Sequence, residues 1–135
     1  MQKNIFKKEY IALLEGAIKN NTETISAPIA RKTNSIIQRE VNKNGETAIS
    51  HYSVLKRYSN YTLVKYILET GKTHQLRVHS AYIGHSILGD TLYGNCSDKI
   101  TRQALHAIKV QFVHPITKKN VQYIAKIPND ILYLL

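Results

Sequence analysis

One arginine lies in the middle of a segment that has the pattern of a short buried helix. The segment runs from Thr73 to Gly84, with Thr73 as a candidate N-cap and Gly84 as the stop. Both faces of this helix would carry apolar side chains, so Arg77 should be buried with them. A buried guanidinium requires an anionic partner, because desolvating an unpaired charge costs several kcal/mol. The helix itself offers no acidic residue three or four positions from Arg77.

The partner of Arg77 stays open at this level. Glu69 before the helix and Asp90 after it are the candidates within the chain, and either would make a structural ion pair. The other candidates are a phosphate group and a carboxylate that this chain does not contain. Either of these two would make Arg77 part of a functional site.

The histidines and the cysteine argue against a metal site. His74, His79 and His85 lack the spacing of a zinc-binding helix, and Cys96 is the single cysteine of the chain. His79 lies on an apolar face and is expected to be a hydrogen-bonded core residue. The sequence also lacks a phosphate-binding Gly-rich loop that ends in Gly-Lys-Ser/Thr and a Gly-x-Ser-x-Gly nucleophile elbow.

Strands are predicted for most of the remaining chain. They are expected, from alternating or β-branched apolar residues, at 10–14, 22–29, 47–58, 61–70, 103–113 and 121–127. Ser59-Asn60 would turn a hairpin between the third and fourth of these strands. The fold class is therefore α+β, a mixed, largely antiparallel sheet with a few flanking helices.

Two further segments complete this prediction. The basic, polar stretch from Arg31 to Gly45 is expected to be a mobile loop, with at most a weak strand at Ile36-Ile37. Pro128 is placed to begin a short C-terminal helix.

Charge indicates the class of partner. Nineteen Lys and Arg face nine Asp and Glu, so the net charge is +10, and this balance favours a polyanion such as nucleic acid. A solvated basic surface would give the same count, and charge does not distinguish RNA from DNA. The sequence contains no apolar run of membrane-spanning length and no secretory signal pattern, so a cytoplasmic protein without a membrane partner is expected.

A longer pattern adds a family resemblance. Residues 68–94 read LETGKTHQLRVHSAYIGHSILGDTLYG and resemble the signature of RluA-like RNA pseudouridine synthases. In the same order, the stretches KKEYIALLEG at 7–16, SAPI at 26–29, QALHA at 103–107 and FVHP at 112–115 resemble other motifs of that family. The resemblance covers essentially the whole chain. It implies a part of the pseudouridine synthase catalytic domain, residues 1–135 being its C-terminal portion.

The resemblance implies roles for individual residues. Such enzymes isomerise uridine to pseudouridine in ribosomal or transfer RNA without a cofactor or metal. Tyr10 would be the active-site tyrosine that stacks on the target base, Arg77 would pair with the nucleophilic aspartate, and Leu105 would form part of the apolar pocket wall. The RNA-binding residues would be Arg31, Lys32, Arg39, Lys72 and His74. Ordinary readings remain open: Tyr10 and Leu105 as core residues, and the basic stretch as an exposed loop.

The family's nucleophile belongs to a His-Arg-Leu-Asp motif that this sequence does not contain. Its three aspartates, Asp90, Asp98 and Asp130, occur in other contexts. The chain by itself is therefore expected not to form pseudouridine, and an exposed sheet edge is expected to favour self-association. A non-catalytic RNA-binding remnant of such an enzyme is the alternative.

Overall fold

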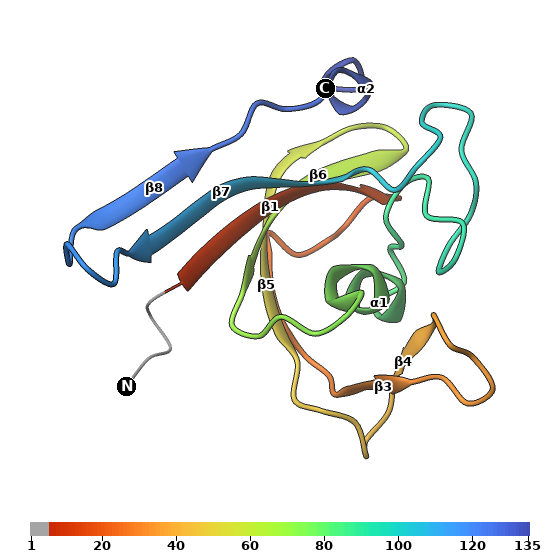
Figure 1. Cartoon of the computed structure of the whole chain (residues 1–135). Coiled ribbons are helices and arrows are strands. Elements are labelled where there is room, and N and C mark those ends of the chain that lie inside the picture. The colour runs from red at the N-terminus through yellow and green to blue at the C-terminus, as the bar shows by residue number, and fades with distance from the viewer. Residues whose placement is uncertain (1–5) are drawn as a thin grey trace.

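A six-stranded antiparallel sheet forms the body of the protein (Figure 1). The computed structural model describes residues 6–135. The strand order is β2-β5-β6-β1-β7-β8. The bounds are β1 Phe6–Glu15, β2 Thr22–Ser26, β5 Ile49–Arg57, β6 Tyr61–Leu68, β7 Leu105–Val113 and β8 Asn120–Ile124. Every pairing between described strands is antiparallel, so the α+β, largely antiparallel prediction is confirmed.

Strand β1 is the centre of this sheet. It pairs with β6 over Glu9–Glu15 and with β7 over Phe6–Ala12, and its apolar run from Ile11 to Leu14 is almost completely buried. Such a continuous apolar run is typical of a strand that is covered on both faces. The hairpin of β5 and β6 around Ser59-Asn60 is confirmed.

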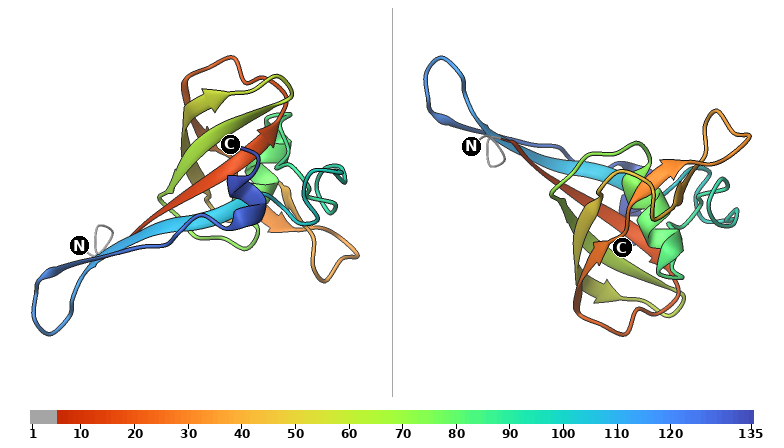
Figure 2. Two further views of the ribbon diagram at one scale, coloured as in Figure 1. Left: turned by 90° about the horizontal axis from the view of Figure 1, so that it is seen from above. Right: turned by 90° about the horizontal axis from the view of Figure 1, so that it is seen from below.

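The two helices cover opposite faces of the sheet. Successive strand residues point to opposite faces, and Tyr66 of β6 bonds to Ser80 of α1 (Gln75–Tyr82), whereas Tyr61 bonds to the carbonyl of Leu134. The views from above and below agree, because α2 (Asn129–Leu132) is in front of the sheet in one view and α1 in the other (Figure 2). The short C-terminal helix that begins after Pro128 is confirmed.

The segment predicted as a mobile loop contains a second small sheet, so that prediction is wrong. β3 (Ile29–Arg31) pairs with β4 (Arg39–Val41), and Ile29 is buried with Ala48 and Val78 in a separate apolar cluster. Ile36 and Ile37 are outside the strands and are 86% and 64% exposed. The apolar contacts that hold the β3–β4 hairpin in place are therefore at its base, where Ile29 packs against Ala48 and Val78.

Helix α1 starts differently from the prediction. Its N-cap is His74, not Thr73, and no side chain caps the helix. His74 adopts the left-handed conformation, with φ 57° and ψ 21°, which few non-glycine residues adopt. Gly84, with φ +85°, ends the helix as predicted. No helix among the described residues is long and apolar enough to cross a membrane.

Candidate active site

A cavity of about 940 Å³ opens between β1, the start of β7 and the N-terminal end of α1. The cavity gathers five of the residues that the family resemblance singles out: Tyr10, Lys72, His74, Arg77 and Leu105. These residues are far apart in the sequence, and the strand order brings them together because β1 lies between β6, which leads into α1, and β7. The arrangement makes this cavity the candidate active site.

Tyr10 and Leu105 come from neighbouring strands. Tyr10 is opposite Tyr66 on β6 and Ala107 on β7, and the register with β7 shifts between Glu9 and Tyr10. Such irregularities redirect a side chain and are common beside active sites. Leu105 is the first residue of β7, opposite Ala12, and both Tyr10 and Leu105 are partly buried. The two side chains offer the cavity an aromatic and an aliphatic wall.

The guanidinium of Arg77 is held by Asp90. Its Nε and Nη2 donate to the two carboxylate oxygens of Asp90, each at 2.9 Å. Asp90 is fully buried, and the Arg77 side chain is 17% exposed. Of the partners left open by the sequence, the structure therefore contains the ion pair with Asp90. Asp90 already balances the charge of Arg77, so this charge does not require a carboxylate from outside the chain. The Nη1 atom of Arg77 has no hydrogen-bond partner within residues 6–135.

The ion pair keeps Asp90 ionised. Burial works to raise the pKa of Asp90, but hydrogen bonds from Arg77 and from the backbone N–H groups of Tyr93 and Leu92 outweigh it and hold this pKa below its usual range. The hydrogen bond to Asp90 raises the pKa of Arg77. Arg77 thus presents a permanent positive charge at the cavity wall.

The loop that carries Asp90 is tightly packed. Gly89 has φ +81°, and a Cβ there would be 2.2 Å from the carbonyl oxygen of Arg102. A Cβ at Gly94 would be 2.3 Å from the hydroxyl of Ser86. Real side chains do not tolerate such distances, so both positions require glycine and fix where Asp90 meets the helix.

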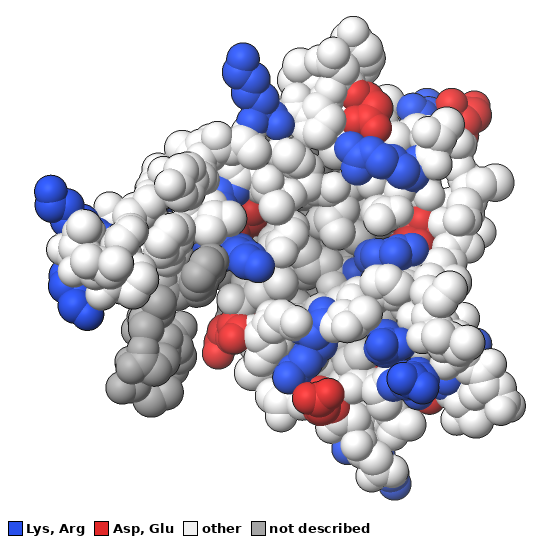
Figure 3. Space-filling model, in the orientation of Figure 1, with Lys and Arg blue, Asp and Glu red and all other residues white. Residues whose placement is uncertain are grey.

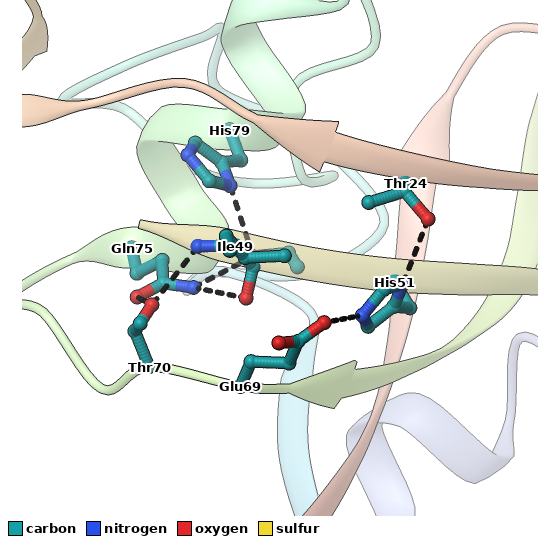
Figure 4. A network of polar contacts seen from close by, with 8 residues as sticks. Thr24, Ile49, His51, Glu69, Thr70, Gln75 and His79 are labelled. Carbon is teal, nitrogen blue, oxygen red and sulfur yellow. Dashed lines mark hydrogen bonds and ion pairs between the residues drawn. The ribbon is translucent and has the colours of Figure 1, made fainter. Parts of the chain in front are cut away.

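A buried amide positions the first turn of α1. Oε1 of Gln75 accepts hydrogen bonds from the Thr70 hydroxyl at 2.8 Å and the Lys72 N–H at 3.0 Å. Nε2 of Gln75 donates to the Ile49 carbonyl at 3.0 Å and to the Ser50 hydroxyl at 2.8 Å, and Figure 4 shows the amide between these segments. Gln75 therefore ties the helix start and the cavity rim to β5.

The two histidines of α1 have different environments. His79 is fully buried between the Ser50 hydroxyl and the Ala27 carbonyl, each 2.9 Å away, and burial lowers its pKa. The expectation of a hydrogen-bonded core histidine is confirmed. His74 instead lines the cavity and lies 2.7 Å from the hydroxyl of Tyr93. Burial, together with the charges of Arg77 and Arg39, lowers the pKa of His74.

The basic residues of the β3–β4 hairpin lie outside the cavity lining. Arg31 and Lys32 are exposed, whereas Arg39 is partly buried and its Nη1 donates to the Ile37 carbonyl at 3.1 Å. Figure 3 shows Lys and Arg side chains gathered on the side of the molecule formed by this hairpin. Lys72, at the cavity rim, pairs with Glu46 at 3.2 Å. Within residues 6–135, no group of three or more His, Cys, Asp or Glu could hold a metal ion.

Comparison with known proteins identifies the family of this chain. The family model described as RNA pseudouridylate synthase matches residues 1–82. The chain belongs to the RNA pseudouridylate synthase family. The predicted resemblance to RluA-like enzymes is confirmed, because the chain is 37% identical to the protein named Ribosomal large subunit pseudouridine synthase D from Haemophilus influenzae, over 100% of its own length.

Other relatives of this pseudouridylate synthase family member agree. The Bacillus subtilis protein named Uncharacterized RNA pseudouridine synthase YjbO is 42% identical over 99% of the chain. The solved structure of Human RNA Pseudouridylate Synthase Domain Containing 1 superposes with a TM-score of 0.81 at 27% identity, over 93% of this chain and 56% of that one. The chain spans about half the length of the curated relatives it matches, 48% for YjbO and 46% for the Haemophilus protein.

Two residues that shape the candidate site, Gln75 and Tyr93, are not singled out by the sequence. Gln75 lies within the predicted helix, and Tyr93 lies near the end of the 68–94 stretch. Neither contact could be read from spacing, because Ile49 and Arg39, which they bind, are 26 and 54 positions away. The available signal was that both residues stand inside the long family motif.

Proposed function

We propose that this chain forms the active-site half of an RNA pseudouridine synthase, which isomerises uridine to pseudouridine in ribosomal or transfer RNA. The observation that carries the proposal is the single cavity that brings Tyr10, Arg77 and Leu105 together on a chain of this family. In the proposal, residues 1–135 are the C-terminal portion of the catalytic domain.

Each residue would contribute a distinct interaction. A uridine must leave the base stack before its glycosidic bond can be reached, and the Tyr10 ring would stack on the extruded base. Leu105 would close the apolar side of the pocket. Arg77, oriented by Asp90, would use its remaining Nη1 edge to stabilise an ionised carboxylate beside the sugar. These roles require no cofactor and no metal.

The nucleophilic carboxylate would come from a segment outside this chain. Among the described residues that line the cavity, Glu69 is the one carboxylate, and its Oε2 is bonded to Nε2 of His51. Asp90 is engaged by Arg77, and Asp130 pairs with Arg102 at 2.8 Å. Asp98 is exposed and, like Asp90 and Asp130, is not among the residues that line the cavity. No described aspartate therefore faces a uridine bound in the cavity. We propose that the 135-residue chain is inactive by itself.

The RNA would reach the cavity across a basic surface. Arg31, Lys32 and Arg39 on the β3–β4 hairpin and Lys72 and His74 at the rim would contact its backbone, since Lys and Arg supply the sequence-independent part of RNA affinity. We place this activity in the cytoplasm, by analogy with relatives named for the ribosomal large subunit. No membrane takes part in this proposal.

A tritium-release assay tests the catalytic part. RNA carrying uridine tritiated at C5 should release no tritium with the chain alone. Adding a polypeptide that contains the His-Arg-Leu-Asp motif of a full-length relative should produce turnover, and Arg77→Leu should abolish that turnover. Turnover by the chain alone would contradict the predicted inactivity.

A second function follows from the same cavity. If no aspartate-bearing segment joins the chain, the cavity and the basic hairpin would serve a non-catalytic RNA-binding protein. The absence of a free aspartate among the described lining residues supports this alternative. RNA binding without tritium release in the presence of every cellular polypeptide carrying that motif would favour it.

Self-association is a further part of the proposal. β8 is an edge strand of the sheet, and the neighbouring residues Tyr123 and Ile124 on it are 65% and 69% exposed. Exposed apolar edge strands are templates for pairing with another chain. We expect concentration-dependent association in sedimentation equilibrium, reduced by Ile124→Lys. A monomer at all concentrations would contradict it.

A further inference from the structure

A phenol hydroxyl behind the cavity connects three segments of the chain. Tyr93 Oη accepts a hydrogen bond from the backbone N–H of Arg39 at 2.9 Å and lies 2.7 Å from Nδ1 of His74. The Tyr93 ring meets the His74 ring edge to face, with centroids 5.5 Å apart, and lies 5.2 Å from the guanidinium carbon of Arg77. Tyr93 therefore contacts the β3–β4 hairpin and two residues of the cavity wall.

The two hydrogen bonds of the Tyr93 hydroxyl favour one tautomer of His74. A phenol has one proton, and the Arg39 N–H already donates to its oxygen. The Tyr93 proton then points to Nδ1 of His74, which accepts it, so the ring proton of a neutral His74 is on Nε2. In the opposite arrangement, with Nδ1 donating, the Tyr93 proton would have no acceptor within residues 6–135.

The surroundings of His74 favour the neutral ring. Burial lowers its pKa, and the positive charges of Arg77 and Arg39 act in the same direction, against Asp90. A ring that accepts at Nδ1 is also necessarily uncharged. Nε2 of His74 bonds to no described residue and is not among the buried polar atoms without a partner. It is therefore open to a ligand on a residue that lines the cavity.

We propose that Tyr93 is a positioning residue that holds His74 as an uncharged hydrogen-bond donor, its Nε2–H directed to an oxygen acceptor of the bound RNA. The RNA part of this inference rests on the proposed function, whereas the state of His74 does not. Because Tyr93 also binds the backbone N–H of Arg39, it fixes the position of the His74 ring relative to the β3–β4 hairpin.

The state of His74 is tested by long-range proton–nitrogen NMR on the ¹⁵N-labelled chain at neutral pH. We expect an unprotonated Nδ1 and a protonated Nε2. Tyr93→Phe keeps the ring but removes the hydroxyl, so His74 should become a mixture of tautomers and the Arg39 amide proton should shift. His79 is the internal control, because its contacts do not involve Tyr93. Tyr82→Phe, at a 61% exposed ring, is the matched variant and should change neither signal.

Three results would overturn the inference: an Nδ1–H tautomer in the wild-type chain, a doubly protonated ring at neutral pH, or an unchanged His74 in a folded Tyr93→Phe chain. Should Tyr93→Phe fail to fold, the wild-type spectrum decides on its own, because the tautomer follows from the hydrogen-bond direction.

The RNA part is tested separately. His74→Gln retains an N–H donor, whereas His74→Leu does not, so binding of uridine-containing RNA should weaken about threefold to tenfold for the leucine variant and be largely restored by glutamine. Titration with uridine or with inorganic phosphate, read at His74, separates a carbonyl or ribose oxygen from a phosphate oxygen. Equal RNA affinity for both variants would overturn this part. A wild-type chain that binds no RNA would instead refute the proposed function and leave the NMR result standing.

Discussion

Arg77 and Asp90 form a two-pronged ion pair between helix α1 and the loop that follows it, with both nitrogen–oxygen distances at 2.9 Å. The Nε and Nη2 atoms of Arg77 bind both carboxylate oxygens of Asp90, which is fully buried. The consequence is that Arg77 is preorganised before any ligand arrives. The same pair makes Asp90 part of the stability of the fold.

Asp90→Asn should destabilise the chain by about 3–5 kcal/mol at neutral pH, because it leaves a largely buried guanidinium without its counter-charge. The pKa of Asp90 is lowered in the folded state, so its contribution is complete above the unfolded value of about 4. The contribution is lost as the pH falls through the folded pKa. In urea unfolding, the difference in the free energy of unfolding between the wild type and Asp90→Asn should become smaller below about pH 4.

Asp98→Asn is the control for this experiment, because Asp98 is exposed and has no ion pair among the described residues. It should follow the wild type at every pH. A gap for Asp90→Asn that stays constant down to pH 2 would show that the ion pair is not the source of the stability.

Gln75→Ala should destabilise the fold by about 2–4 kcal/mol, because it removes four hydrogen bonds, including the one that the buried Ser50 hydroxyl accepts. Gln122→Ala on exposed β8 removes the same amide without these contacts and should be nearly neutral. Chemical denaturation compares the two variants. Equal effects would mean that the amide network does not hold the start of α1.

Three glycines should respond to alanine in a graded way. Gly89→Ala introduces a Cβ 2.2 Å from a backbone oxygen at positive φ, so it should be the most damaging and should displace Asp90. Gly84→Ala has positive φ but open space and should cost about 1–2 kcal/mol. Gly71→Ala has neither problem and should be neutral or slightly stabilising. The melting temperature should be lowest for Gly89→Ala, intermediate for Gly84→Ala and highest for Gly71→Ala. Any other order would contradict the backbone geometry and packing described for these glycines.

The sheet was largely predictable because its strands carry local signals. The alternation in β5 and β6, the apolar run of β1 and the Gly84 stop each depend on neighbours in the sequence. The buried Arg77 could be predicted for the same reason, since its helix has apolar residues on both faces. The choice of Asp90 over Glu69 could not, because it depends on how the loop 85–94 folds back on α1. Glu69 instead meets His51 on the neighbouring strand (Figure 4).

The errors concern segments whose structure comes from distant contacts. The β3–β4 hairpin reads as a polar loop, and its order depends on Ile29 packing against Ala48 and Val78 and on Tyr93 holding Arg39. The start of α1 reads as a Thr73 cap, but the Gln75 side chain bonds Ile49 and Ser50 on β5 as well as the Lys72 N–H, and the N-cap is His74. In both cases a contact from outside the segment overrides a local preference.

The basic hairpin should contribute to RNA affinity through phosphate contacts. The double change Arg31→Gln and Lys32→Gln should weaken binding of uridine-containing RNA. It should also reduce the slope of log affinity against log salt by about 1.4–1.8, because each lost phosphate contact removes roughly 0.7–0.9. The matched control, Lys118→Gln with Lys119→Gln, removes the same charge from the tip of the β7–β8 hairpin, which lies far from β3 and β4 (Figure 2). Fluorescence anisotropy over a salt series measures both. An equal loss of slope in the two double variants would show that net charge, rather than this hairpin, determines the affinity for RNA.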